Sequence, residues 1–433
     1  MNVWLLTVGE PLPSDGGLPR MLRAGILFDM LCDHGHTVDW WTSSFNHQLK
    51  EPRSANYQRI VHRPGGVIHL LPGRRYRSTV SFARIGNHRD NARAFERLAH
   101  EQARRPDIIV CSYPTLELCE AAIAFGQSTS TPVVVDVRDL WPDIFRELIP
   151  DWAWPLARLL LAPMYWQSRR VMVRASAITG ITADFVRWGV TRGGRQETSL
   201  DRAFAMAYVE QPPSAQALSQ AHAAWRQLGV DPQHFNFAFF GTVGRQFDLS
   251  TVVQAARLIR DPRIRFVLCG TGDKLDRYRA EAAGLDNVLF PGWVDAPMIR
   301  ELMSMSWAGL APYNLSDNFN SNIPNKIVEY LAGGLPIITT LTGIPRQLID
   351  EFECGAGYTH GDPNSLASEI TNLVSNPQRQ RGMSERSLAL YRLRFDASRV
   401  YGEMIDHFAH IIERHAAASD GRFAGTESTV RRS

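Results

Sequence analysis

The sequence is poor in lysine, in cysteine and in net charge. Of its 47 basic residues only Lys50, Lys274 and Lys326 are lysine, and the formal net charge is +3. The arginines are dispersed among nearly as many acidic residues, so no nucleic-acid-binding surface is predicted. The five cysteines are an odd number without metal-like spacing, which predicts reduced core residues and a cytoplasmic protein.

Long apolar runs are also absent. The first residues, MNVWLLTVGEPLP, have no basic start and only a short apolar run, which predicts a buried first strand rather than a secretion signal. No stretch approaches the length of a membrane span. Two stretches, 73–89 and 151–170, mix arginine with aromatic residues. They predict either peripheral docking on an anionic inner membrane or packed helices with solvated arginines, and docking is our hypothesis.

Short apolar runs alternate with helical patterns along the chain. Such runs lie at 3–8, 37–42, 107–112, 133–138 and 176–182 in the first half, and at 236–241, 265–270, 287–292, 307–313 and 336–340 in the second. Strands separated by helices form parallel sheets that are covered on both faces. The predicted fold class is therefore α/β, with two doubly wound Rossmann-like domains.

Two adjacent prolines near 211 mark the predicted linker between an N-terminal domain, 1–210, and a C-terminal domain, 211–395. Val400, Met404, Phe408 and Ile411 recur at helical spacing, which predicts an amphipathic helix over 396–417. Its apolar stripe must pack against another part of the protein. Residues 418–433 are expected to be a flexible tail.

The segment from Pro324 to Pro336, PNKIVEYLAGGLP, predicts a short helix between two strands. Lys326 falls in its first turn, where the helix dipole disfavours a cation unless an anion lies nearby. Glu329 follows one turn later, a spacing at which its carboxylate can accept from ribose hydroxyls. The alternative is a solvated lysine on an ordinary amphipathic helix, with Glu329 paired to an arginine.

Several further motifs occur in an order that is informative as a set. They are Gly16-Gly17 before a helix containing Arg20, FFGTVGR at 239–245, LCGTGDKL at 268–275 and FPGWV at 290–294. Together with PNKIVEYLAGGLP they resemble the retaining glycosyltransferases of the GT-B fold, family four. WWTSSF and DLWPD place the resemblance in a subgroup that builds bacterial surface polysaccharides. It implies two domains facing a central cleft, with the C-terminal helix crossing back to the N-terminal domain.

The resemblance implies that the C-terminal domain binds a nucleoside diphosphate sugar. Gly241 and Gly244 would bring backbone amides close to the diphosphate, and Arg245 and Lys326 would bind its oxygens in place of a metal. We therefore expect no metal and no cofactor besides the donor substrate.

The same resemblance places Gly270 and Gly272 around the nucleotide and the main chain of Trp293 and Val294 near its base. For the Gly270 loop, a plain strand-to-helix turn is an equal alternative. Near the N-terminus, Gly16, Gly17 and Arg20 are expected to face the cleft, with Arg20 on a phosphate; the alternative is a surface arginine.

Two departures from the family pattern concern the sugar and the diphosphate. The place of the family's first acidic residue is Ser321, so Ser321 or Asn322 would have to bond the sugar hydroxyls beside Glu329. The family's lysine shortly after Arg245 is missing, since the chain continues Gln246-Phe247.

Asp139 follows the strand pattern VVVDVR, and the carboxyl end of a parallel strand is where chemistry occurs in such sheets. It could accept the acceptor's proton, or it could cap a helix that starts near Trp141. Asp136 is a less favoured substitute. His34 and His36 have no third ligand at metal spacing and are better explained by a turn.

These observations predict an enzyme that transfers a hexose or amino sugar, with retention, to a glycan or polyprenyl-linked acceptor bound by the N-terminal domain. Two alternatives remain: a nucleotide-sugar 2-epimerase on the same fold, and a scaffold that binds nucleotide sugars without catalysis.

Overall fold

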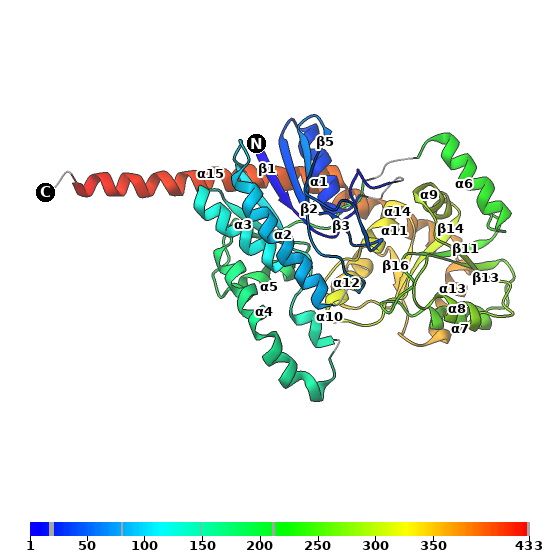
Figure 1. The fold of residues 1–433 in the computed structure, drawn as a ribbon. Coiled ribbons are helices and arrows are strands. Elements are labelled where there is room, and N and C mark those ends of the chain that lie inside the picture. The colour runs from blue at the N-terminus through cyan, green and yellow to red at the C-terminus, as the bar shows by residue number, and fades with distance from the viewer. Residues whose placement is uncertain (17–20, 79–80, 148, 210–212, 431–433) are drawn as a thin grey trace. The chain divides into compact units, whose positions relative to one another are not determined.

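The structure is a computed structural model, and it describes residues 1–16, 21–78, 81–147, 149–209 and 213–430. The chain forms two compact units, one of Met1–Ala205 with Ala397–Ser433 and the other of Met206–Asp396. Each unit contains a central sheet covered by helices (Figure 1). The predicted α/β fold with two Rossmann-like domains is confirmed.

The first unit is built on an eight-stranded sheet in the order β10-β9-β8-β7-β1-β2-β6-β5. Every neighbouring pair is parallel except β5 with β6. The strands are β1 Asn2–Leu6, β2 Thr37–Ser43, β5 Gln58–Arg63, β6 Gly66–Leu71, β7 Ile108–Tyr113, β8 Val133–Val137, β9 Ala177–Gly180 and β10 Arg202–Ala203. The strand order reverses between β1 and β7, and ligands bind beyond the carboxyl ends of strands at such a point.

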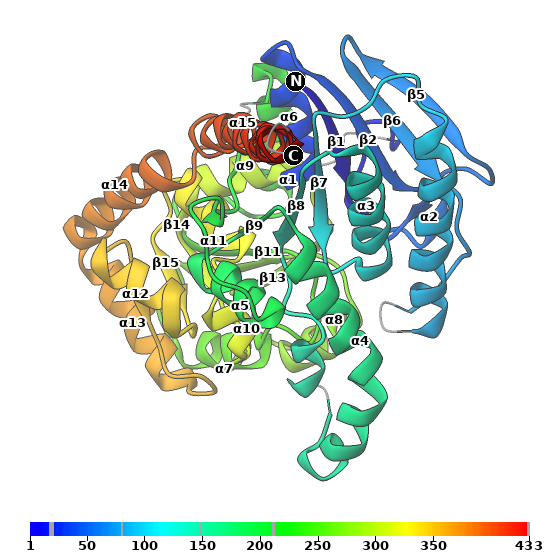
Figure 2. The same cartoon turned by 90° about the vertical axis from the view of Figure 1, so that its left-hand side faces the viewer.

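Helices cover both faces of this sheet. Helix α1 (Arg23–Asp33) contacts α15 (Ala397–Val430) on one face, and α2 (Phe82–His100) contacts α3 (Leu116–Thr129) on the other (Figure 2). Further elements of this unit are α4 Trp154–Arg174, α5 Ala183–Gly193, the 3-10 turns η1 Asp143–Glu147 and η2 Asp151–Ala153, and the short pair β3 Phe45–Asn46 and β4 Glu51–Pro52.

Aromatic side chains form the core between the sheet and α2 and α3. The Trp4 ring lies 5.1 Å from both Trp41 and Phe125 and 6.1 Å from Phe95, measured between ring centroids. All four side chains are at most 3% exposed. Burial of such large rings supplies much of the hydrophobic stabilisation of this layer.

The hairpin of β5 and β6 was not predicted. Strand β5 has no buried residue, so it lacks the apolar run by which most strands were recognised. Strand β6, GVIHLL, has such a run and was nevertheless not predicted. Its turn contains Gly65 at a φ of +78°, a left-handed backbone that glycine adopts without strain. The Pro-Gly-Gly sequence at 64–66 was the available signal for a turn.

The predicted C-terminal helix is present as α15. Its stripe residues Val400, Met404, Phe408 and Ile411 are at most 8% exposed. The helix contacts α1, where the Arg23 Nη2 atom lies 3.6 Å from the Met404 sulfur. It continues to Val430, past residue 418 where a flexible tail was expected. Three alanines at 416–418 favour helix there.

The second unit has a six-stranded, all-parallel sheet in the order β13-β12-β11-β14-β15-β16. Its strands are β11 Phe235–Phe240, β12 Ile264–Cys269, β13 Val288–Gly292, β14 Ser306–Ala311, β15 Ile337–Thr339 and β16 Gly355–Gly357. Its helices are α6 Ala215–Gln227, α7 Leu249–Leu258, α8 Leu275–Glu281, α9 Ala296–Ser304, α10 Asp317–Asn320, α11 Asn325–Ala332, α12 Gly343–Glu351, α13 Pro363–Ser375 and α14 Pro377–Arg394. Across the described residues, no helix is both long enough and apolar enough to span a bilayer.

Candidate functional site

The carboxyl ends of β11, β12 and β13 are joined by backbone hydrogen bonds. The Gly241 N–H donates to the Cys269 carbonyl oxygen at 3.1 Å, and the Gly270 N–H donates to the Gly292 carbonyl oxygen at 2.6 Å. A β-carbon placed on Gly270 would lie 1.8 Å from the Gly241 carbonyl oxygen. Glycine at 270 is therefore required for the two loops to pack, which is the turn alternative of the sequence analysis.

Gly272 has the same role, because a β-carbon there would lie 2.1 Å from the Val243 carbonyl oxygen. The amides of the two glycines in the β11 loop are already used: Gly241 donates to Cys269, and Gly244 donates to the Thr242 carbonyl oxygen at 3.0 Å. Within the described part of the chain, the neighbouring amides of Thr242 and Arg245 donate to no acceptor. These two amides, rather than those of the glycines, are available to an anion.

Lys326 is placed by the first turn of α11, whose N-cap is Pro324. Its side chain is directed at the end of β11, where its ammonium donates a hydrogen bond to the Phe240 carbonyl oxygen. The Nζ atom lies 4.1 Å from the ring centroid of Phe239 and 5.0 Å from that of Phe247. Lys326 is only 7% exposed. These rings were not predicted, although the two phenylalanines before Gly241 were a visible signal.

Arg245 belongs to the same β11 loop and has an exposed side chain. Its backbone is held by Asn314, whose Nδ2 donates to the Arg245 carbonyl oxygen at 2.6 Å. A β-carbon on Gly241 would lie 2.9 Å from the Lys326 Nζ atom. The loop that carries Arg245 therefore begins against the ammonium of Lys326.

Glu329 and the loop that precedes α11 are close to Lys326 in the sequence. Glu329 is 4% exposed, one turn beyond Lys326 on α11. Ser321 and Asn322 are half-buried and lie between α10 and α11. The Asn322 Oδ1 atom is buried, and no donor among the described residues bonds to it. A buried acceptor without a donor is costly, so a ligand hydroxyl would be favourable there.

The remaining predicted positions are more peripheral. Trp293 is 73% exposed, and with Val294 it connects β13 to α9, which Asp295 caps through the Met298 amide at 3.0 Å. Gly16 is exposed in the segment after β1. Gly17 and Arg20 lie outside the described residues.

Asp139 lies in the first unit, two residues after the end of β8, and is half-buried. Burial raises its pKa to about 6, although the Arg84 guanidinium acts in the opposite direction. Its carboxylate accepts no hydrogen bond from any described residue, and the first amides of η1 donate instead to backbone oxygens. The capping role considered for Asp139 is therefore not present.

Asp136, the less favoured substitute, is a structural residue. It is fully buried and accepts from Arg23 at 2.9 Å, Arg138 at 2.8 Å and Thr179 at 2.8 Å. Burial alone would raise the pKa of Asp136, but the two guanidinium groups outweigh it and hold the pKa well below its usual range. A carboxylate enclosed in this way is a poor proton acceptor.

His34 and His36 are part of the turn after α1, as expected. The His34 Nδ1 atom lies 2.7 Å from the Met30 carbonyl oxygen, and the His36 Nδ1 atom lies 3.2 Å from the N-terminal nitrogen. Within the described ranges, no three His, Cys, Asp or Glu side chains gather as metal ligands do.

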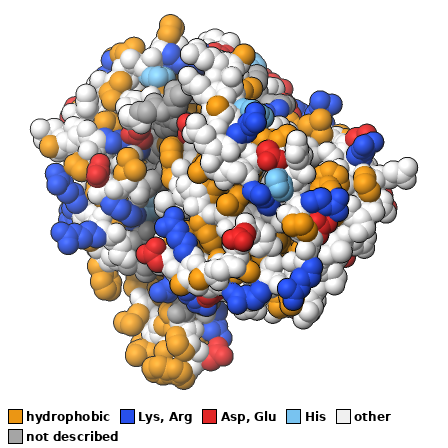
Figure 3. Space-filling view, turned by 90° about the vertical axis from the view of Figure 1, so that its right-hand side faces the viewer, with side chains coloured by type: hydrophobic (Ala, Val, Ile, Leu, Met, Phe, Trp, Pro, Cys, Tyr) orange, Lys and Arg blue, Asp and Glu red, His pale blue; other side chains and the backbone are white. Residues whose placement is uncertain are grey.

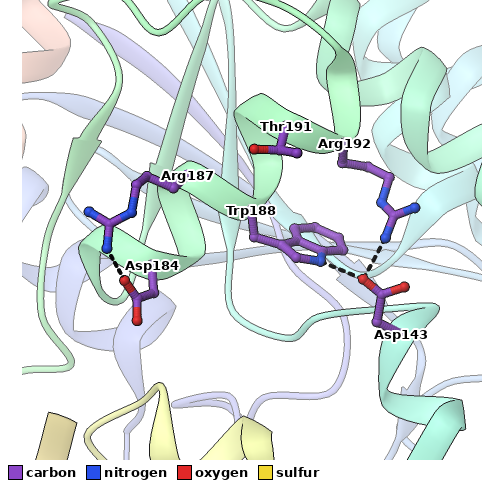
Figure 4. Close-up of a pocket in the computed structure, with 6 residues that line it drawn as sticks. All are labelled: Asp143, Asp184, Arg187, Trp188, Thr191 and Arg192. Atoms are coloured by element: carbon purple, nitrogen blue, oxygen red, sulfur yellow. Dashed lines mark hydrogen bonds and ion pairs between the residues drawn. The ribbon is translucent and has the colours of Figure 1, made fainter. Parts of the chain in front are cut away.

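A separate pocket in the first unit is lined by Asp143, Asp184, Arg187, Trp188, Thr191 and Arg192 (Figure 4). Its charged groups are paired with each other: Arg187 with Asp184, and Arg192 and the Trp188 indole with Asp143. None of the predicted site residues lines this pocket. Because its charged groups are already paired, this pocket is a weaker candidate for binding an anionic ligand than the carboxyl ends of β11, β12 and β13.

Comparison with known proteins gives a consistent result for both units. A model described as glycosyl transferase 4-like domain matches residues 23–198, and one described as glycosyl transferases group 1 matches residues 234–376. No curated protein matches the sequence.

Solved structures of similar fold span almost the whole chain. The Anabaena protein HepE in complex with UDP is 14% identical with a TM-score of 0.64, covering 94% of this chain and 99% of its own. Sucrose-phosphate synthase from Thermosynechococcus elongatus is 16% identical with a TM-score of 0.69, covering 95% and 99%. WaaG, a glycosyltransferase involved in lipopolysaccharide biosynthesis, is 13% identical with a TM-score of 0.62, covering 94% and 99%.

Proposed function

We propose that this chain, a glycosyltransferase of the GT-B fold, transfers a hexose or amino sugar from a nucleoside diphosphate sugar to a glycan or lipid-linked acceptor. Transfer would occur with retention and without a metal, in the synthesis of a surface polysaccharide. The membership in family four and its surface-polysaccharide subgroup is part of this proposal. Complexes of the similar HepE with UDP and with UDP-glucose support the nucleotide-sugar donor.

The observation that carries the proposal is the ammonium of Lys326, buried at the carboxyl end of β11. Removing a cation from water is costly, and a diphosphate bound against the β11 loop would offset that cost. The amides of Thr242 and Arg245 and the Arg245 guanidinium would add donors to its oxygens. These groups could also take up the charge that develops on the departing nucleoside diphosphate.

The sugar would be held by the groups that precede and follow Lys326. We assign the donor's sugar hydroxyls to Asn322 and Ser321, and the nucleoside's ribose to Glu329. The orphaned Asn322 Oδ1 atom supports this assignment, because a hydroxyl is the donor that it lacks. The Trp293 and Val294 main chain would then lie toward the base.

Thermal shifts with UDP, GDP and dTDP test the donor site. We expect one of these nucleotides to raise the melting temperature of the wild type, and Lys326→Ala to abolish most of that rise because the diphosphate loses its buried cation. Arg381→Ala is the matched control, since Arg381 is an exposed cation on α14 of the same unit. An equal rise in the wild type and in Lys326→Ala would contradict the donor site.

Product analysis separates transfer from the two alternatives. An epimerase would change the sugar of the donor without any acceptor, and a scaffold would bind the donor without turning it over. We expect free nucleotide to be released from the preferred nucleotide sugar only when lipid extract is supplied. Its release without acceptor, together with an epimerised sugar, would favour the epimerase.

A further inference from the structure

Side chains from three segments, His47 and Lys50 from one of them, lie together beyond the carboxyl edge of the first unit's sheet. His47 follows β3, Tyr76 follows β6, and Arg84 lies in the first turns of α2. The His47 Nδ1 atom lies 2.6 Å from the Tyr76 hydroxyl oxygen and 3.4 Å from the Lys50 Nζ atom. The same ammonium lies 5.2 Å from the centroid of the Tyr76 ring. For the stretch 73–89, membrane docking and packed helices with solvated arginines were the two predictions, and neither included such a cluster.

The contacts of His47 with Tyr76 and Lys50 indicate which ring nitrogen carries its hydrogen. The Lys50 ammonium can only donate, so its contact favours the tautomer in which Nδ1 is the acceptor and Nε2 carries the hydrogen. The Tyr76 hydroxyl at 2.6 Å is then the main donor to Nδ1. Burial, together with Arg84 and Lys50, lowers the pKa of His47 to about 4. The imidazole is therefore neutral at neutral pH, and its Nε2–H is a donor.

Arg84 extends the cluster to Asp139. Its guanidinium lies 5.3 Å from the centroid of the Trp141 ring and acts electrostatically on Lys50, His47 and Asp139. Burial lowers the pKa of Arg84 and of Lys50, and the Arg84 guanidinium lowers that of Lys50 further. Both side chains are half-buried. The nearby helix α2 also carries His88 and Arg89, which lie 3.9 Å and 3.6 Å from the Glu117 carboxylate.

We propose that Lys50, Arg84, His47 and Tyr76 form an anion subsite that binds a phosphate group of the acceptor beside Asp139. Two cations and the Nε2–H of His47, which Tyr76 orients through Nδ1, match several oxygens of a phosphate ester. This inference rests on the proposed function and narrows its acceptor to a phosphorylated one. The acceptor hydroxyl would then lie near the carboxylate that is proposed to take its proton.

Binding of farnesyl diphosphate and of inorganic diphosphate tests the subsite, with the full chain kept in saturating UDP so that the donor site is filled. We expect one additional molecule of either probe to bind. Arg84→Met and Lys50→Asn should each weaken that binding about tenfold or more, which is the loss of one charge-assisted hydrogen bond. Asparagine is chosen because Lys50 has a φ of +59° and asparagine tolerates that backbone.

Arg77→Ala is the matched control, since Arg77 is an exposed arginine of the same 73–89 stretch. It should bind both probes as the wild type does. Wild-type affinity in Arg84→Met and Lys50→Asn, or binding of inorganic diphosphate without farnesyl diphosphate, would overturn the acceptor subsite. The UDP-induced thermal shift of the same variants should be unchanged, which separates this outcome from a failure of the proposed donor site.

Discussion

At the scale of single residues, Asp136 and Asp139 show how three positions along one segment change the chemistry of a carboxylate. Asp136 is inside β8, where Arg23 and Arg138 keep it ionised and fully bonded. Asp139 lies beyond the end of the strand and is half-buried, and no described residue donates a hydrogen bond to its carboxylate. The first residue therefore stabilises the sheet, whereas the second retains proton affinity near neutral pH.

We predict that Asp139→Asn lowers kcat by about 100-fold or more, the typical contribution of a positioned proton acceptor. The pKa of Asp139 is raised to about 6, so the wild-type kcat should rise with pH through about 6 as the carboxylate ionises. The variant should lack this acidic limb. A pH profile of kcat for both proteins measures the difference, and an identical acidic limb would assign that proton transfer to another group.

The stability of Asp139→Asn tests whether Asp139 has a structural role as a helix cap. Because the folded pKa of Asp139 lies above the usual 3.8, the folded protein binds more protons than the unfolded chain between about pH 4 and 6, and its stability falls as pH rises through that window. Asp139→Asn removes this cost, so it should melt at the same or a higher temperature than the wild type at pH 7.5. A helix cap would instead lose stability in Asp139→Ala and keep it in Asp139→Asn.

At the scale of elements, α4 stands out among the helices of the first unit. Its buried residues are Ser168, Val171 and Met172, all in its second half. Large apolar side chains of the preceding turn and the first half are exposed: Trp152 86%, Leu156 65%, Leu159 70% and Leu160 73%. Hydrophobic side chains gather at the lower end of the view in Figure 3, the level at which Figure 1 shows the beginning of α4.

An apolar surface of this kind marks an interaction site, and arginines accompany it. Arg158 is exposed within the same turns of α4. The stretch 73–89 also exposes one aromatic side chain, Phe82 at 93%, but two of its other residues fit the membrane hypothesis less well. Arg74 is paired with Asp90 at 2.8 Å, and Tyr76 is only 4% exposed. We therefore assign the proposed contact with an anionic membrane to α4.

We predict that the double change Leu159→Glu and Leu160→Glu reduces sedimentation with phosphatidylglycerol vesicles by about tenfold or more, because two apolar side chains are replaced by charges that anionic lipid repels. Leu258→Glu is the control, since Leu258 is a 46% exposed leucine of the second unit. High salt should weaken binding of the wild type. Equal sedimentation of both variants with the wild type would leave α4 as a surface for another partner.

At the scale of the whole molecule, the proposed reaction uses cations of the chain where other enzymes use a metal ion. Lys326 and Arg245 would neutralise the leaving diphosphate, and both belong to the second unit. We predict that dialysis against a chelator leaves the transfer rate within about twofold of the untreated rate. Added Mg²⁺ should not raise it. A rate that collapses in chelator and returns with Mg²⁺ would contradict this account, and Lys326→Ala should be inactive under both conditions.

The sequence by itself determined the fold class and the positions at which most strands end and loops begin. Apolar runs between helices are set by local patterning, so most strands of both sheets and α15 could be predicted. Strands β5, β6, β10 and β16 were not predicted: β5 buries no residue, and β10 and β16 are only two and three residues long. The same patterning located Lys326, Glu329 and Asp139, since residue type and place in an element are local properties.

Only the tertiary structure decided what those residues contact. Gly270 and Gly272 proved necessary for packing two loops, and the free amides proved to be those of Thr242 and Arg245. The cluster of Lys50, His47, Tyr76 and Arg84 joins segments that are distant in sequence, as does the enclosure of Asp136 by Arg23 and Arg138. Burial and electrostatic coupling arise from such long-range contacts, and no local pattern of residues specifies them.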